Sequence, residues 1–149
     1  MKPILLAAIC MLALSAARAQ STEFRNPPEL AKPNGYTHVV IVNRGKLVLI
    51  SGQTGLNSKG EISPDFAVQA KQAFANLKIA LAAAGAKPTG LVKLNYYIVG
   101  LSHDKLLALR DARDSVIDKQ HPPASTLAGV QALFRPDVQI EIDAEAVIP

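Results

Sequence analysis

The residues that could carry chemistry in this 149-residue chain lie near the ends of segments rich in β-forming residues. They are Tyr36, Gly52, Gln53, Asn95, Ser125, Thr126 and Glu141. Glu141 by itself is one carboxylate on a solvated strand face, and Gln53 could simply be exposed. Glycine at position 52 allows another segment to approach the backbone closely. Taken alone, these residue types fit either a small-molecule cleft or an exposed polar strand face.

Other kinds of site are excluded because their residues are missing. No GxGxxG, GxSxG or Walker A sequence occurs, so the common phosphate loops and the hydrolase nucleophile elbow are absent. The histidines lack the spacing of metal ligands: His38, His103 and His121. Arg110, Arg113 and the aspartates near them are predicted to form a solvated face of a helix. No aromatic residues alternate with basic ones in the manner of a nucleic-acid-binding platform.

The first nineteen residues predict export. Lys2 is followed by an uninterrupted apolar run at 4–15, and Ala17-Arg18-Ala19 has the small-x-small pattern of a signal peptidase site. The run is too short for a lasting membrane span, which needs roughly 20 residues. Residues 1–19 are therefore interpreted as a signal peptide, and the mature protein as periplasmic or secreted. Cleavage would remove two basic residues and the single Cys10, lowering the formal charge from +4 to +2, so neither nucleic acid nor membrane is expected as a partner.

The first half of the mature chain predicts an arm, a hairpin and a helix. Residues 20–35 are rich in proline and asparagine and are expected to be extended, without regular structure. Val39–Val42 and Leu47–Ile50 are β-branched or apolar runs joined by a short glycine-containing turn, which is typical of a hairpin. Ser63 is expected to cap a helix whose apolar stripe recurs every three or four residues and which ends at Gly85.

The second half predicts a strand, a helix and two more strands. The strand 91–99 is expected to be covered on both faces. A helix capped by Ser102 is expected to end at His121-Pro122-Pro123. Strands are then expected at 126–133 and 138–147. This order predicts an α+β domain over 36–149, with a single mixed β-sheet and two helices packed on one face. Since no element remains for the second sheet face, self-association through that face is expected.

The order of short motifs resembles the Rid family (reactive intermediate deaminase, also called YjgF or L-PSP). The motifs are Gly35-Tyr36-Thr37-His38, Ser51-Gly52-Gln53, Gln72, Phe74, Asn76-Leu77, Leu81, Ala84-Gly85-Ala86, Val92-Lys93, Pro123-Ala124-Ser125-Thr126, Gly129-Val130, Ala132-Leu133 and Ile140-Glu141-Ile142-Asp143-Ala144. Together they span residues 35–147. Each motif is weak by itself, and their occurrence in order at the family's spacing makes the resemblance specific.

The resemblance implies a chorismate-mutase-like fold, a homotrimer, and ligand clefts between neighbouring subunits. Members of the family hydrolyse 2-imino acids or their enamine tautomers to 2-keto acids and ammonia, without metal or cofactor. By this resemblance Glu141 would position the attacking water and Tyr36 would close the cleft. Gly52, Gln53, Asn95, Ser125 and Thr126 would bind the substrate.

One motif departs from the family. Ser125 stands where the family has an arginine that holds the substrate carboxylate, and a serine cannot form a bidentate, charge-assisted pair. Hydrolysis of 2-imino acids is therefore expected to be feeble. Two functions stay open: hydrolysis of an imine, enamine or related metabolite without a carboxylate clamp, or non-catalytic binding of a small molecule in the same cleft. Ribonuclease activity is disfavoured by the low positive charge.

Overall fold

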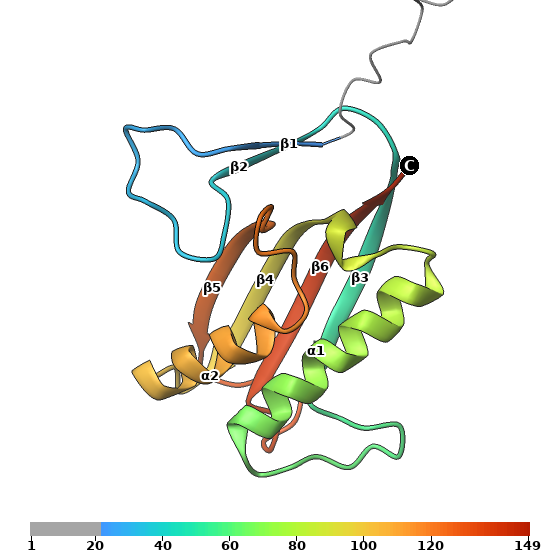
Figure 1. Cartoon of the computed structure of the whole chain (residues 1–149). Coiled ribbons are helices and arrows are strands. Elements are labelled where there is room, and N and C mark those ends of the chain that lie inside the picture. Colours follow the sequence, from blue (N-terminus) through green and yellow to red (C-terminus); the bar gives the residue numbers. More distant parts are fainter. Residues whose placement is uncertain (1–21) are drawn as a thin grey trace, which may run out of the picture.

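The computed structural model describes residues 22–149, which fold as one sheet-and-helix unit with a small ribbon beside it (Figure 1). The strands are β1 (Thr22–Arg25), β2 (Val39–Val42), β3 (Lys46–Thr54), β4 (Leu91–Val99), β5 (Ala124–Val130) and β6 (Ile140–Ile148), and the helices are α1 (Phe66–Ala83) and α2 (His103–Asp114), with a 3-10 turn at Pro88–Gly90. The predicted signal peptide, residues 1–19, lies outside the described residues.

The main sheet has the strand order β3-β6-β4-β5. β6 is antiparallel to both β3 and β4, whereas β4 and β5 are parallel. The parallel pair needs a crossover connection, which α2 supplies. Both helices lie on the same face of the sheet (Figure 1). The predicted α+β architecture, a mixed sheet with two helices on one face, is confirmed.

The expected first hairpin does not form. β2 pairs with β1 in a separate two-stranded ribbon, while β3 pairs with β6 over most of its length. The prediction that the whole of 20–35 lacks regular structure is also wrong, because Thr22–Arg25 forms β1. A β-branched run indicates a strand but does not specify its partner, and β3 pairs with β6, which has nine residues, whereas β2 has four.

Thr37 attaches the ribbon to the rest of the domain. Its side chain is buried, its Oγ1 donates a hydrogen bond to the Pro122 carbonyl at 2.6 Å, and its N–H donates to the Pro123 carbonyl at 3.2 Å. The chain leading into β2 is thereby held beside the start of β5. This contact also brings Gly35 and Tyr36 next to α2 and β5.

Both helices begin near the predicted positions, but one cap, the end of α2 and the start of β5 differ from the prediction. Asp65 caps α1 by accepting a hydrogen bond from the Val68 N–H at 2.9 Å, so Ser63 is not the cap. Ser102 caps α2 as predicted. α2 ends at Asp114, before the proline pair, and β5 begins at Ala124, two residues earlier than expected.

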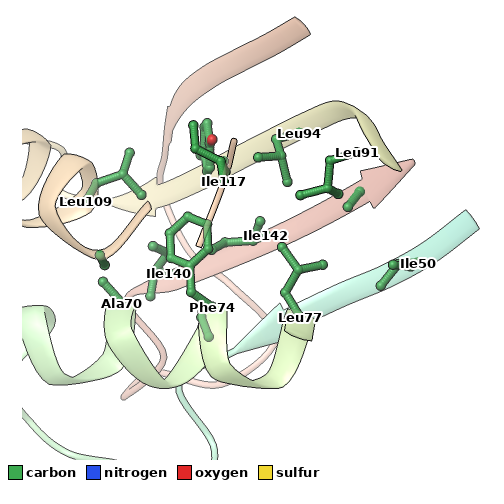
Figure 2. Packing of buried hydrophobic residues seen from close by; sticks show 14 of the residues in the cluster. Ile50, Ala70, Phe74, Leu77, Leu91, Leu94, Leu109, Ile117, Ile140 and Ile142 are labelled. Atoms are coloured by element: carbon green, nitrogen blue, oxygen red, sulfur yellow. The ribbon is translucent and has the colours of Figure 1, made fainter. Parts of the chain in front are cut away.

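The hydrophobic core lies between the helices and one face of the sheet (Figure 2). Phe74 and Leu77 of α1 pack over Ile140 and Ile142 of β6, and Leu94 of β4 is fully buried beside them. Along β4 the buried residues alternate with partly exposed ones. The second face of β4 is open in the single chain, so the expected cover on both faces would have to come from another subunit.

Candidate functional site

The open face of the sheet carries a polar strip formed by β4, β5 and β6. Directly opposed residues in neighbouring strands place their side chains on the same face. The pairings Asn95 with Thr126, Asn95 with Asp143, and Tyr97 with Glu141 therefore put five polar side chains on the face opposite the helices.

Glu141 is positioned by a glycine on the neighbouring strand. The pairing of β3 with β6 is irregular between Ile50 and Gln53, which is typical of a β-bulge. A Cβ added at Gly52 within this bulge would lie 2.6 Å from Cδ and 2.8 Å from Cγ of Glu141. The Glu141 carboxylate therefore lies directly over the Gly52 backbone, in space that any other residue would fill.

Asn95 and Tyr97 extend the strip from Glu141. The Asn95 Nδ2 donates a hydrogen bond of 2.7 Å to Asp143 Oδ1. The negative charge of Asp143 raises the pKa of the Tyr97 phenol, and a hydrogen bond to the same carboxylate adds to this effect. Tyr97 therefore keeps its proton at neutral pH, and a ligand beside Glu141 could accept the hydrogen bond that the phenol otherwise donates to Asp143.

Thr126 lies on the same face, but its hydroxyl group already accepts a hydrogen bond. Lys93 Nζ donates a hydrogen bond of 2.7 Å to Thr126 Oγ1. The strip is thus acidic in balance, since Glu141, Asp143 and Glu145 lie on β6 and Lys93 is the cation on β4.

Gln53 does not join this strip. Its Nε2 donates a 3.0 Å hydrogen bond to the Ser51 carbonyl, and the residue lines an open cavity of about 620 Å³ along α1. Gln72 and Asn76 border the same cavity. Asn76 already donates to the carbonyls of Thr54 and Leu56, so its amide secures the chain that follows β3.

Ser125 and Tyr36 lie on the helix side of the sheet. Ser125 is opposite Leu94, whose side chain is buried beneath the helices. Both Ser125 and Tyr36 line a cavity of about 210 Å³ near α2. Within one chain the sheet therefore separates Ser125 and Tyr36 from Glu141.

Four polar residues on the strip and in the 210 Å³ cavity were not predicted as site residues. Lys93 and Tyr97 share a face with Asn95, and the period of two along β4 was the signal that pointed to them. Arg110 and Arg113 were expected on a solvated helix face, which is wrong. Arg113 is 7% exposed and both arginines line the 210 Å³ cavity.

Comparison with known proteins identifies the family. A sequence profile described as Endoribonuclease L-PSP matches residues 28–148. The chain belongs to this family, the Rid (YjgF) family. The 2-iminobutanoate/2-iminopropanoate deaminase of Escherichia coli K12 is 34% identical over 110 residues, covering 71% of this chain and 83% of the relative. The deaminase of the same name from Dermatophagoides farinae is 32% identical over 124 residues, covering 81% and 92%.

Solved structures of Rid proteins have the same fold. A Rid-family protein of unknown function from Yersinia pestis, YyfB, has a TM-score of 0.78 at 33% identity, covering 87% of this chain and all of its own. The yjgF gene product of Escherichia coli has a TM-score of 0.61 at 31% identity, covering 72% and 85%. The fold of this Rid protein is thus chorismate-mutase-like.

Residues 22–149 contain neither a metal-binding cluster nor a membrane-spanning helix. Within that range no three His, Cys, Asp or Glu side chains are grouped so that they could hold a metal ion. None of the helices in the same range has both the length and the apolar character needed to cross a membrane.

Proposed function

We propose that the protein is a Rid-like hydrolase that acts on a small imine or enamine without a cofactor. The observation that carries this proposal is the Glu141 carboxylate, which lies over Gly52 beside the Tyr97 phenol. The names of the Escherichia coli and Dermatophagoides farinae relatives support the reaction class.

The strip has the groups that imine hydrolysis needs. Glu141 accepts a hydrogen bond from a water molecule and directs its oxygen at the imine carbon. The C=N bond becomes a C–N single bond as the C–O bond forms, while Glu141 takes one proton from the water and passes it to the nitrogen. The second proton of the water reaches the nitrogen by the same route before the C–N bond breaks. The Tyr97 phenol donates a hydrogen bond to the nitrogen or oxygen of this intermediate. Collapse of the intermediate forms the C=O bond and releases ammonia.

The charges of the strip favour an uncharged substrate. Three carboxylates lie on β6, and the ammonium of Lys93 is directed to Thr126. A carboxylate placed beside them would be repelled and would lack the bidentate partner that an arginine offers. The replacement of the family arginine by Ser125 is consistent with this preference. We therefore expect the protein to hydrolyse 2-imino acids more slowly than neutral imines.

Non-catalytic binding of a neutral small molecule is the second candidate. The observation that favours it is the same Ser125, because the family's substrate clamp is missing while the fold is retained. Such a protein would bind its ligand on the polar strip and would release no ammonia.

We further propose that the protein is a secreted or periplasmic homotrimer with its clefts between subunits. Leu47 and Leu49 of β3 are 55% and 73% exposed. Both lie on the open sheet face, because they pair with Val147 and Glu145. Apolar side chains beside a polar strip are typical of a surface that another subunit covers. The signal peptide proposed at 1–19 would direct export.

The deciding experiment measures ammonia release by the purified chain from residue 20 onward. Freshly generated 2-iminopropanoate and its uncharged analogue 2-iminopropanamide serve as substrates. We expect faster turnover of the amide, and a fall of roughly 10²- to 10⁴-fold in Glu141→Gln. Glu145→Gln is the matched control. It removes one negative charge from the same face of β6, farther along the strand from Glu141, and should stay active. Equal rates for wild type and Glu141→Gln would refute the assignment. No turnover of either substrate, together with binding of the amide, would favour the second candidate.

A further inference from the structure

Asn34-Gly35 is the only asparagine–glycine pair in the chain. A peptide nitrogen can attack the side-chain amide of the asparagine before it, and glycine has no side chain to obstruct that attack. The pair lies in a bend of the segment 26–38, which joins β1 to β2 and contains neither helix nor strand. Gly35 has φ +75°, a left-handed conformation that glycine adopts without strain.

Neither reacting group of the pair is held by a hydrogen bond. Asn34 is exposed, and its side-chain amide has no hydrogen-bond partner in residues 22–149. The Gly35 N–H likewise donates to no atom of that range. The amide carbon of Asn34 and the nitrogen of Gly35 can therefore approach each other without breaking a hydrogen bond.

The other asparagines are restrained. Asn57 precedes the small Ser58, but its Oδ1 accepts hydrogen bonds from the N–H groups of Lys59 and Glu61 at 2.9 Å and 3.0 Å. Its Nδ2 donates to the Glu61 carboxylate at 2.8 Å. The remaining four are also held or blocked: Asn26 precedes a proline, Asn43 donates to Glu23, Asn76 lies in α1 and Asn95 lies in β4.

Asn34 borders a cavity that holds two guanidinium groups. Arg110 and Arg113 line this cavity of about 210 Å³ together with Asn34. The Arg113 guanidinium lies against Gly35, since a Cβ added there would be 2.6 Å from its Nη1. Arg113 is ion-paired with Asp114 at 2.7 Å, whereas Arg110 forms no ion pair or hydrogen bond within residues 22–149. A carboxylate at position 34 would therefore meet a positive charge that lacks a partner.

We propose that Asn34 is a site of spontaneous deamidation, which places a carboxylate beside Arg110. The Gly35 nitrogen loses its proton to hydroxide and attacks Cγ of Asn34, a step that the nearby Arg113 charge favours. The new N–Cγ bond closes a succinimide ring. The Cγ–Nδ2 bond breaks, and the leaving nitrogen takes a proton from water to become ammonia. Water then opens the ring at one of its two carbonyl carbons, giving either aspartate or isoaspartate.

The modification also affects the chain that follows the pair. Isoaspartate lengthens the main chain by one carbon, while Thr37 remains bonded to the carbonyls of Pro122 and Pro123. Gly35 and Tyr36 must therefore change position to accommodate it. The proposal does not rely on the proposed hydrolysis, because it uses neither the polar strip nor a bound substrate.

Mass spectrometry of the chain from residue 20 onward measures the reaction. The protein is incubated at neutral and at mildly alkaline pH and then digested with trypsin. The peptide 26–44 contains Asn34 together with Asn26 and Asn43, which serve as internal references. We expect acid to form at Asn34 at least roughly tenfold faster than at these references or at Asn57, a barrier difference of about 1.4 kcal/mol. The rate should rise with hydroxide concentration, and each chain should release one ammonia.

Synthetic peptides of residues 26–44 and 50–65 separate the effect of the sequence from that of the fold. Asn34 should react about as fast in the folded protein as in its peptide, because the fold leaves it free. Asn57 should react at least roughly tenfold more slowly in the protein than in its peptide, because its hydrogen bonds must break first.

Variants test the product and its charge. Asn34→Gln keeps an amide whose longer side chain is less well placed for ring closure, so it is the matched control and should release no ammonia. Asn34→Asp should have a thermal midpoint roughly 2–4 °C above that of Asn34→Gln, the size of a modest ion pair. This gain should vanish in Arg110→Gln and persist in Lys78→Gln, which removes an exposed charge of α1. Glu141→Gln should deamidate like wild type, so this proposal and the proposed hydrolysis fail separately.

Two results would overturn the proposal. One is acid formation at Asn34 that is no faster than at Asn57 in the folded protein. The other is an equal midpoint for Asn34→Asp and Asn34→Gln, or a gain that Arg110→Gln leaves unchanged, because either would place the carboxylate away from Arg110.

Discussion

Replacing Gly52 with alanine is expected to destabilise the protein through its contact with Glu141. The added Cβ would lie 2.6 Å and 2.8 Å from two carbons of the Glu141 side chain. Carbon atoms that are not bonded ordinarily lie about 3.5–4.0 Å apart, so the side chain must leave its position. A side chain forced off its rotamer costs about 0.5–1.5 kcal/mol, and overpacking costs about 1–3 kcal/mol. Because Glu141 lies at the surface and can turn away, we expect a loss of about 1 kcal/mol.

A double-mutant cycle isolates this contact. Urea unfolding is measured for Gly52→Ala, Glu141→Ala and the double variant, all at one protomer concentration, since stability of an oligomer depends on concentration. In the Glu141→Ala background the alanine at 52 should be neutral or slightly stabilising, because a strand loses about 0.5–1 kcal/mol when it contains glycine instead of alanine. The expected coupling between the two sites is therefore about 1–2 kcal/mol.

Glu145→Ala provides the control for this cycle. It removes a carboxylate from the same face of β6, but no atom of Glu145 is among the neighbours nearest to a Cβ at position 52. Gly52→Ala should cost as much in that background as in wild type. Additive effects of the Gly52 and Glu141 changes, or equal coupling to Glu145, would refute the close packing of the carboxylate on the glycine.

Four more predictions concern stability, assembly and processing. The Tyr96 pKa of about 12 exceeds the unfolded value of about 10, so stability present below pH 10 should fall by roughly 2–3 kcal/mol between pH 10 and 12, and Tyr96→Phe should lack this loss in urea melts. Gly35→Ala should cost about 1–3 kcal/mol in thermal unfolding, because φ is +75° and the new Cβ would lie 2.6 Å from Arg113 Nη1. Light scattering should give the mass of three chains, and a monodisperse monomer would exclude the proposed trimer. Mass spectrometry of the native protein should show a chain that begins at Gln20, whereas a chain with Met1 would exclude cleavage.

The elements that could be predicted from the sequence are those encoded by local patterns. The apolar stripe of α1 and the alternation along β6 are short-range signals, and both elements occur where they were expected. Pairing partners are not local, so the run Val39–Val42 was identified as a strand but assigned to the wrong neighbour. The cap of α1 was displaced by two residues for a related reason. Ser63 and Asp65 are both suitable caps, and the packing of Phe66 against the core selects between them.

The sequence named candidate site residues but could not assign them to faces of the sheet, because residue types are visible in the sequence and faces are not. Glu141, Asn95 and Thr126 do lie on one sheet face, as strand pairing requires. Ser125 is adjacent to Thr126 and therefore lies on the other face. Arg113 was assigned to solvent because arginine is seldom buried. Its burial depends on Gly35, a residue far away in the chain whose missing side chain leaves room for the guanidinium.

The position of β6 has a consequence for how the protein folds. The last strand of the chain lies inside the sheet, between β3 and β4, and Lys46 pairs with Ile148 near the C-terminus. The sheet therefore cannot be completed until β6 has been synthesised, and its contacts join residues far apart in sequence, a topology that folds slowly. Until β6 is available, β3 and β4 lack the strand that lies between them. Such a delay suits the proposed export, since a polypeptide that threads through a membrane channel must reach it before its tertiary structure is complete.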